Sequence, residues 1–241
     1  MLEVRELRKS FDGFQAVGGV SFSVPRGSVS AIIGPNGAGK TTLFNLITGH
    51  LRADAGSVRF KDREVTGIAP HDLCGLGMGR SFQRTNIFPR LTVFQNIQAA
   101  FLCHRGRGWN LLAPVDRFYQ EETEALLDSV GLLDKEDELA VNLSHGEQRN
   151  LEIAIALATD PQLLCLDEPT AGMSVTETHA TVELVRRIGR NLTILVVEHD
   201  MEVVMNLAHR ITVLHYGEVL AEGTPEEIQA NPRVQEVYLK G

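Results

Sequence analysis

Long hydrophobic runs and cysteines are scarce in this chain, and each shortage narrows what the protein can be. No apolar run approaches the roughly 20 residues that cross a bilayer, so any membrane contact is expected to come from another chain. The three cysteines form an odd set without framework spacing, and the first residues are charged. We therefore expect reduced thiols and no signal peptide, as in a cytosolic protein.

Basic residues are also in deficit. The 23 Lys and Arg residues face 31 Asp and Glu residues, which gives a formal net charge of −8. Because a surface that binds nucleic acid needs an excess of positive charge, this balance argues against nucleic acid as a partner. Aromatic residues are few, at 6%, but hydrophobic residues make up 43% of the 241. That share is enough for the core of one large domain or two small ones.

A glycine-rich segment near the start matches the phosphate-binding pattern G-x-x-x-x-G-K-[ST]. The apolar run Val29–Ile33 before it predicts a buried strand, and Leu43–Ile47 after it predicts a helix that stops at Gly49. In that setting backbone N–H groups can face phosphate oxygens, with Lys40 reaching the β- and γ-phosphates and the Thr41 hydroxyl binding Mg²⁺. The predicted nucleotide-binding residues are Gly34, Pro35, Asn36, Gly37, Ala38, Gly39, Lys40, Thr41 and Thr42.

Two carboxylates follow a second apolar strand, Leu163–Leu166. Ligands of parallel sheets lie beyond the carboxyl ends of the strands, so Asp167 is predicted to hold Mg²⁺ beside the loop threonine. Glu168 is then placed to orient and deprotonate an attacking water. The apolar run Thr193–Val197 leaves the sheet at the same edge, where His199 could donate a hydrogen bond to the γ-phosphate or the water.

The segment Leu143–Gln148 predicts a second anion-binding helix start. Ser144 is a good N-cap residue, Gly146 allows close backbone approach, and a long apolar helix at Leu151–Ala158 follows. A chain with one phosphate loop rarely needs a second cradle for itself. This helix start is therefore expected to serve a nucleotide that another subunit holds.

The order of elements predicts an α/β nucleotide-binding core interrupted by a helical insertion. Alternating runs predict strands in the first portion, the region of about 91–157 is mostly helical, and buried strands and helices alternate after it. Such alternation implies a parallel sheet with right-handed crossovers. We expect one domain over residues 1–241. Its parts are a core with a β-subdomain (1–84 and 159–230), a helical subdomain (85–158) and a C-terminal tail (231–241).

Several helix boundaries can also be predicted. Thr92 can cap a helix over Val93–Leu102, and Ser174 and Thr224 each open a capping box. Within the helical region, a further helix is predicted by apolar residues that recur at helical spacing. These residues are Val115, Phe118, Tyr119, Leu126, Leu127 and Val130.

Together these segments resemble an ATP-binding-cassette (ABC) ATPase subunit over essentially the whole chain. The family signature Leu-Ser-Gly-Gly-Gln is matched by residues 143–147, its loop glutamine by Gln83 and its switch histidine by His199. The resemblance implies a P-loop NTPase (RecA-like) core with an N-terminal antiparallel β-subdomain and an inserted α-helical subdomain. ATP and Mg²⁺ are the implied cofactors.

The same resemblance assigns roles to individual residues. Glu168, His199 and Gln83 are implied to be catalytic, and the implied ligands of Mg²⁺ are Thr41, Gln83 and Asp167. The aromatic residue that stacks on adenine matches Phe11, with Phe14 the weaker candidate.

The resemblance further implies a head-to-tail dimer of cassettes that sandwiches two ATP molecules. Ser144, His145, Gly146 and Glu147 would then bind the nucleotide of the opposite subunit. Here His145 replaces a glycine and Glu147 replaces a glutamine, but the serine and the second glycine are kept, so the cradle should survive. The loop at 171–174 ends in serine where the family usually has Asp or Asn.

The transported substrate can be narrowed only by kinship. Segments 80–96, 150–154 and 231–239 are similar to ATPases of branched-chain amino acid importers. The variants at 143–146 and 171–174 also resemble urea and short-chain amide importers. We favour hydrophobic amino acids, with urea or amides as the alternative and aromatic acids still open, because other subunits select the substrate.

The expected complex contains a second, homologous cassette, two polytopic membrane permease subunits and a periplasmic or surface substrate-binding protein. This chain is expected on the cytoplasmic face of the inner membrane. Its contact with the permeases is expected at the start of the insertion, through Phe88, Leu91 and Phe94, with Phe88 the best surface candidate. Non-transport cassettes of DNA repair or ribosomes carry coiled-coil insertions or two cassettes, which this chain lacks.

Overall fold

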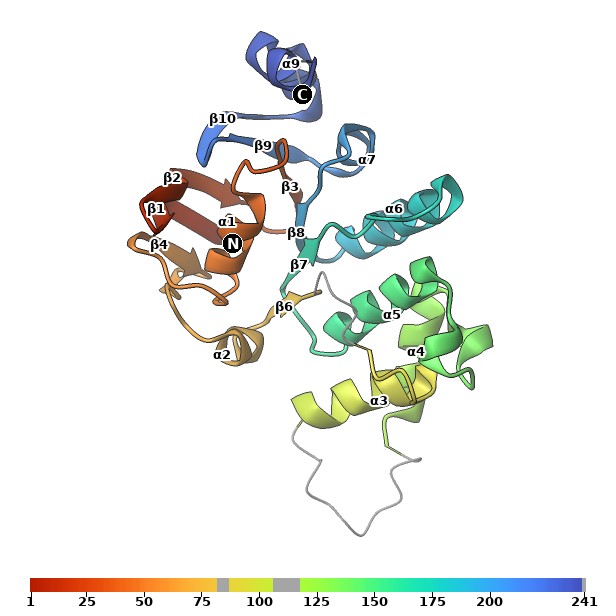
Figure 1. Ribbon diagram of the computed structural model, residues 1–241. Coiled ribbons are helices and arrows are strands. Elements are labelled where there is room, and N and C mark those ends of the chain that lie inside the picture. Colours follow the sequence, from red (N-terminus) through yellow and green to blue (C-terminus); the bar gives the residue numbers. More distant parts are fainter. Residues whose placement is uncertain (82–86, 106–117, 240–241) are drawn as a thin grey trace.

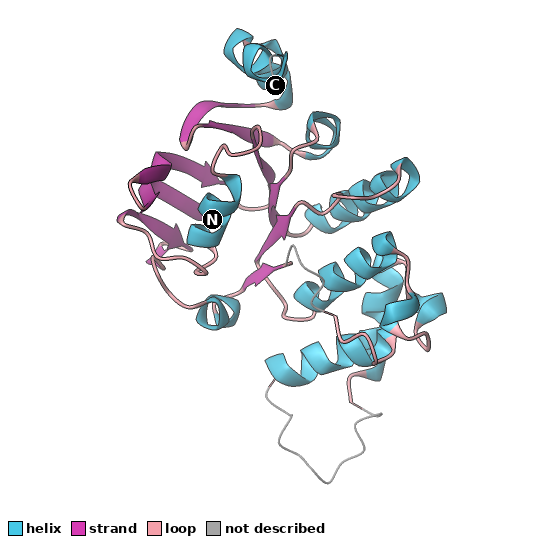
Figure 2. Ribbon diagram, in the orientation of Figure 1, coloured by secondary structure: helices cyan, strands magenta, loops and turns pink. Residues whose placement is uncertain are grey.

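Two β-sheets and a group of helices form the molecule in a computed structural model that describes residues 1–81, 87–105 and 118–239 (Figures 1 and 2). The first sheet is antiparallel, with strand order β2-β1-β4-β5. Its strands are β1 (Leu2–Phe11), β2 (Phe14–Val24), β4 (Ala55–Phe60) and β5 (Arg63–Glu64). This sheet confirms the β-rich first portion that the alternating runs predict.

The second sheet has the order β10-β9-β3-β8-β7-β6 and is parallel apart from β10, which runs antiparallel to β9. Its strands are β3 (Val29–Ile33), β6 (Met78–Arg80), β7 (Leu163–Asp167), β8 (Thr193–Val197), β9 (Arg210–His215) and β10 (Glu218–Gly223). Strands β3, β7 and β8 are buried along their whole length. Continuous apolar runs predicted them correctly because helices and the first sheet cover both faces.

The core divides along the two faces of the second sheet. Successive residues of a strand point to opposite faces, so Ile32 joins one hydrophobic cluster and Ile33 the other. Helix α1 (Lys40–Ile47) packs with Ile32 and the first sheet, through Leu43 and Phe44. The opposite face carries the remaining large helices, so α1 and the loop before it lie between the two sheets (Figure 1).

Helices α3 (Val93–His104), α4 (Gln120–Val130) and α5 (His145–Leu157) gather beyond strand β6, as Figure 1 shows. Helices α6 (Val175–Gly189) and α7 (Met201–Leu207) follow β7 and β8. The remaining short elements are α2 (Pro70–Gly75), η2 (Leu133–Lys135), η3 (Ala140–Asn142), α8 (Pro225–Ala230) and α9 (Pro232–Leu239). Among the described residues, no helix combines the length and the apolar character needed to span a bilayer.

The predicted helix starts are confirmed where a polar side chain supplies the cap. Thr92, Ser174 and Thr224 each form a capping box, with the carboxylate or amide three residues later bonding back to the cap. One helical prediction is wrong in part. Phe118 and Tyr119 precede α4, and Tyr119 has a left-handed φ of 59°. Val115 lies outside the described residues.

Residues 118 and 119 have helical spacing because they contact α3, and this explains why they were wrongly predicted to be part of the next helix. The ring of Tyr119 lies 5.5 Å from that of Phe101 on α3, centroid to centroid. The Gln98 Nε2 group donates to the Phe118 carbonyl at 2.9 Å. Helix α3 therefore holds the Phe118 carbonyl and packs against the Tyr119 ring, and neither residue joins the helix that follows them.

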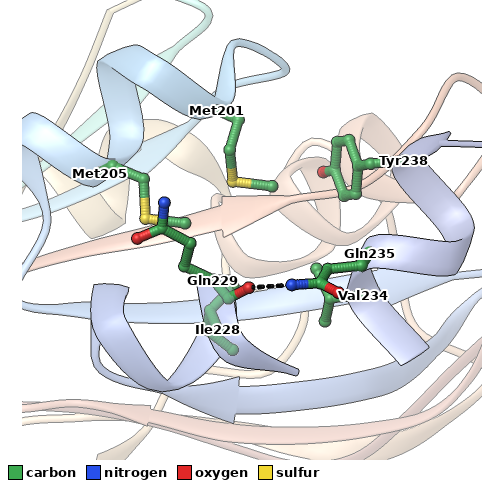
Figure 3. A pocket seen from close by; sticks show the side chains of 7 residues that line it. All are labelled: Met201, Met205, Ile228, Gln229, Val234, Gln235 and Tyr238. Atoms are coloured by element: carbon green, nitrogen blue, oxygen red, sulfur yellow. Dashed lines mark hydrogen bonds between the residues drawn. The ribbon is translucent and has the colours of Figure 1, made fainter. Parts of the chain in front are cut away.

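The C-terminal helices lie beyond strand β10, next to the loop that precedes α1. A groove there is lined by Pro35 and its neighbours in the loop on one side and by Arg233 and Val237 of α9 on the other. A separate pocket of about 470 Å³ opens between α7 and the two C-terminal helices (Figure 3). Its lining residues are Met201, Met205, Ile228, Gln229, Val234, Gln235 and Tyr238.

Candidate nucleotide-binding site

The loop between β3 and α1 is closely enclosed by backbone. Gly39 caps α1 in a left-handed conformation with φ 97°, and a Cβ atom there would lie 2.4 Å from the Ala16 carbonyl oxygen. A larger residue would therefore both strain the loop and push it from the first sheet. Helix α1 starts directly after this glycine, so its first N–H groups face the concave side of the loop.

Lys40 is the first residue of α1, and its side chain reaches back into the loop. Its side chain is buried, and its Nζ donates to the carbonyl oxygens of Gly34 at 2.6 Å and Pro35 at 3.1 Å. Burial lowers the pKa of Lys40, while the negative charges of Glu168 and Glu198 raise it. The ammonium group is thus held by loop oxygens that phosphate oxygens can replace, at the place where the sequence predicts it.

A pocket of about 260 Å³ opens on this loop. It is lined by loop residues 36–42, by Ala16 and Phe14 of β2, and by Glu168. The aromatic residue at this pocket is Phe14, which is 68% exposed, whereas Phe11 is absent from the described lining. Phe11 pairs with Phe14 across the β1–β2 hairpin, and the Lys9 Nζ lies 5.5 Å from its ring centroid. This geometry favours Phe14 over Phe11 as the residue that meets adenine, and the choice between the two stays a prediction.

Asp167 and Glu168 lie at the carboxyl end of β7. Asp167 is 1% exposed, and its Oδ2 accepts from Arg80 at 3.3 Å. Burial raises the pKa of Asp167, and the charge of Arg80 opposes that rise. The other oxygen, Oδ1, is buried and makes no hydrogen bond within the described part of the chain. An unsatisfied buried carboxylate oxygen is costly unless a ligand completes it, and Mg²⁺ prefers such oxygens.

Glu168 adopts a left-handed backbone with φ 45°, which is rare for a residue with a side chain. Its N–H donates to the Val197 carbonyl at 2.9 Å, and its own carbonyl accepts from Arg149 at 3.1 Å. These bonds hold the unusual turn. The carboxylate of Glu168 faces the nucleotide pocket as a result.

The switch histidine reaches the same place from the neighbouring strand β8. The Nδ1 atom of His199 lies 3.9 Å from Glu168 Oε2 and 3.9 Å from Glu198 Oε2. The structure thus brings Lys40, Glu168 and His199 to one edge of the second sheet. Sequence reasoning gave no role to Glu198, although an acidic residue at the end of a buried apolar strand was a signal for one.

The second predicted helix start lies apart from this pocket. Ser144 caps α5 by accepting from the Glu147 N–H at 3.3 Å, and the Glu147 carboxylate accepts from the Ser144 N–H at 2.8 Å. Lys135 binds that carboxylate at 2.6 Å and lowers the pKa of Glu147. The Gly146 N–H donates to Glu177 Oε1 at 3.2 Å. Two carboxylates of the same chain therefore satisfy donors of this helix start.

The other predicted site residues lie at the starts of α5 and α1, apart from one outside the described residues. His145 begins α5 beside Ser144. Thr41 and Thr42 follow Lys40 in the first turn of α1 and line the pocket. Gln83, which the resemblance makes catalytic and a Mg²⁺ ligand, lies outside the described residues. Its position relative to the pocket stays a prediction.

The model of the ABC transporter family matches residues 17–171, which include both the phosphate loop and the Asp167–Glu168 pair. The chain belongs to the ABC transporter family. A second model, of the branched-chain amino acid ATP-binding cassette transporter, matches residues 218–239. As an ABC-type ATPase, the chain binds and hydrolyses ATP.

Relatives and solved structures match this ABC ATPase over nearly its whole length. The chain is 38% identical to the high-affinity branched-chain amino acid transport ATP-binding protein LivG of Salmonella typhimurium, covering 99% of this chain and 97% of that protein. It is also 38% identical to BraF of Pseudomonas aeruginosa, with the same coverage. The ADP conformation of the cassette MJ1267 superposes with a TM-score of 0.90, at 32% identity, covering 100% of this chain and 99% of that one. The predicted fold class is confirmed.

Proposed function

We propose that this ABC ATPase powers the uptake of branched-chain or other hydrophobic amino acids across the inner membrane. The observation that carries the proposal is the match at residues 218–239, because this segment lies beyond the general cassette and matches a model specific to branched-chain amino acid transporters. The names of LivG and BraF support the same substrate class. Urea or short-chain amides are the alternative, from the variants at 143–146 and 171–174.

The direct test is transport in a rebuilt system. The ATPase would be reconstituted in vesicles with its cognate permeases and their binding protein. Leucine-loaded binding protein should then stimulate hydrolysis, whereas binding protein mixed with urea or acetamide should not. Stimulation by urea or amide alone would transfer the assignment to the alternative, and stimulation by phenylalanine alone would move it to aromatic acids.

The site residues take the following roles in this proposal. Lys40 exchanges its bonds to loop carbonyls for the β- and γ-phosphates. Asp167 and the Thr41 hydroxyl would hold Mg²⁺, together with Gln83, and the ion would supply positive charge to offset the charge that develops on the phosphates. The Asp167 Oδ1 atom, which has no hydrogen-bond partner within the described residues, fits such an ion.

Glu168 and His199, at the ends of β7 and β8, activate the attacking water. Glu168 accepts the proton of the attacking water, and its turn aims the carboxylate into the pocket beside Lys40. His199 lies within 3.9 Å of that carboxylate and donates to the γ-phosphate or the water. Phe14 provides an exposed aromatic face at the pocket for the adenine ring.

Partner contacts complete the proposal. The helix start at Ser144 and Gly146, with His145 and Glu147, would bind the nucleotide of a second, homologous cassette in a head-to-tail dimer. An apolar surface patch formed by Phe88, Leu139 and Val141 would dock the two permease subunits on the cytoplasmic face of the membrane. A periplasmic or surface binding protein would deliver the substrate.

A further inference from the structure

Glu198, the last residue before the switch histidine, is a buried carboxylate shared between two loops. It follows β8 and is 0% exposed. Its Oε1 accepts from the Thr170 hydroxyl at 2.7 Å and from the Thr170 N–H at 3.0 Å. Its Oε2 accepts from the His199 N–H at 3.2 Å. The two oxygens therefore bind two separate segments of the chain.

These two segments carry the reacting groups. Thr170 lies two residues after Glu168, in the loop that runs from β7 to α6. His199 opens the loop that runs from β8 to α7. Strands β7 and β8 are neighbours in the sheet (Figure 1), and the Glu168 N–H donates to Val197 on β8. Glu198 adds side-chain bonds just beyond the point where this backbone pairing ends.

The burial of this carboxylate is costly, which makes a purely space-filling role a poor explanation. Burial raises the pKa of Glu198, and the bonds from Thr170 and the His199 N–H oppose that rise. Its charge also raises the pKa of Lys40, so the group lies within electrostatic reach of the phosphate loop. An apolar side chain of similar volume would avoid the cost but would bind neither loop.

We propose that Glu198 is a positioning residue that holds the loop after Glu168 and the switch histidine at a fixed separation. The carboxylate of Glu168 and the ring of His199 then face the same reacting water, 3.9 Å apart. The part of this proposal that concerns hydrolysis rests on the roles proposed for Glu168 and His199. The tether itself rests on the three hydrogen bonds alone.

Hydrogen–deuterium exchange of the nucleotide-free subunit tests the tether without any reaction. Glu198→Gln keeps one acceptor oxygen but places an NH₂ group where Oε2 accepts from His199. Exchange at the His199 amide, which loses its acceptor, should become at least about tenfold faster, and exchange at the Thr170 amide, whose acceptor loses its charge, should rise by less. The exposed neighbour variant Glu202→Gln is the matched control and should leave both amides unchanged. Unchanged exchange in Glu198→Gln would overturn the proposal.

Turnover in the assembled transporter tests the positioning role. Glu198→Gln should lower kcat at least about tenfold through misplacement of reacting groups, with the KM for ATP changed less than about twofold. Thr170→Val should lower kcat similarly, whereas Thr170→Ser, which keeps the hydroxyl, should restore it. The double variant should be no worse than the poorer single one, because both remove the same link.

Additive losses in that cycle would show that Glu198 and Thr170 act separately and would reject the tether. If Glu198→Gln does not fold, Thr170→Val and Thr170→Ser test the proposal by themselves. Equal kcat values in these two variants would contradict it. Retained turnover in Glu168→Gln would reject the assigned base but leave the exchange result standing. The two failures are therefore distinguishable.

Discussion

At the scale of single residues, the bonds of Lys40 explain how the phosphate loop is held ready for a nucleotide. The ammonium group binds two carbonyl oxygens of its own loop, and the negative charges of Glu168 and Glu198 lie near it. In the proposed function, an entering phosphate would replace these carbonyl oxygens, so the buried cation would have oxygen partners before and after binding. Burial lowers the pKa of Lys40, and the negative charges of the two carboxylates oppose that lowering.

Glu168→Gln should separate nucleotide binding from hydrolysis. The amide keeps the size of the side chain but cannot accept a proton from water, so turnover should fall about 10²–10⁴-fold while ATP still binds. The measurement is steady-state ATPase activity of the transporter, with ATP affinity measured on the subunit. Glu183→Gln, an exposed substitution on α6, is the control. Turnover above about a tenth of wild type would contradict the assignment of the base.

Phe14→Ala should weaken ATP binding more than Phe11→Ala. Phe14 lines the pocket and offers an exposed face for adenine, whereas Phe11 lies beside Lys9. Loss of an aromatic stacking partner should raise the Kd for ATP by about fivefold, in line with roughly 0.5–1.5 kcal/mol for such contacts. Titration of each variant with a fluorescent ATP analogue measures this. A larger effect in Phe11→Ala would restore the original preference.

At the scale of elements, the start of α5 has its N–H donors satisfied by carboxylates of the same chain. Its donors bind the carboxylates of Glu147 and Glu177, which come from the helix itself and from α6. Negative charge is stabilised at a helix start, so both acids suit that position. A phosphate from a second subunit would compete with the same carboxylates for these N–H groups.

Ser144→Arg should damage hydrolysis in the complex while sparing ATP binding to the isolated subunit. Ser144 is absent from the described lining of the nucleotide pocket, so its replacement should leave the Kd of the monomer unchanged. Loss of the cap should also lower the free energy of unfolding by about 1 kcal/mol. Thr176→Arg on the exposed start of α6 is the control. Equal loss of ATP affinity in the monomer would place Ser144 in its own subunit's site.

Helix starts that depend on neighbouring residues could be predicted from the sequence. A helix start that depends on contacts with a distant segment could not. The capping boxes at Thr92 and Ser174 depend on residues three apart, so helix starts were correct. The start of α4 was wrong because the Tyr119 ring and the Phe118 carbonyl contact α3, and these tertiary contacts fall on residues with helical spacing.

The same contrast between local and distant contacts holds for the site residues. The phosphate loop and the Asp167–Glu168 pair follow from pattern and strand order. The presence of Phe14 in the pocket lining depends on which way the β1–β2 hairpin faces the loop, which residue spacing does not encode. Glu198 escaped notice because its partner Thr170 lies 28 positions away in the sequence.

At the scale of the whole molecule, the proposed transporter would pass force from the nucleotide pocket to a membrane partner through the surface of the helical part. An exposed patch there joins Phe88 to Leu139 and Val141. The Val141 N–H donates to the Pro89 carbonyl at 3.2 Å, so the two segments that form the patch are linked. Of the other apolar residues predicted for docking, Phe94 packs against the core, and Leu91 is half-buried.

Phe88→Asp should uncouple the ATPase from the permeases without unfolding it. The backbone of Phe88 is held by Asn96, which accepts its N–H at 2.8 Å and donates to its carbonyl at 3.1 Å. The side chain itself is 58% exposed, so a charged replacement should change stability by less than about 0.5 kcal/mol. A carboxylate at the centre of an apolar contact should instead weaken association with the permeases and abolish substrate-stimulated hydrolysis. Co-purification yield and transport measure this, with Val175→Asp, an exposed apolar residue on α6, as the matched control. Wild-type yield and transport in Phe88→Asp would show that the permeases dock on another surface.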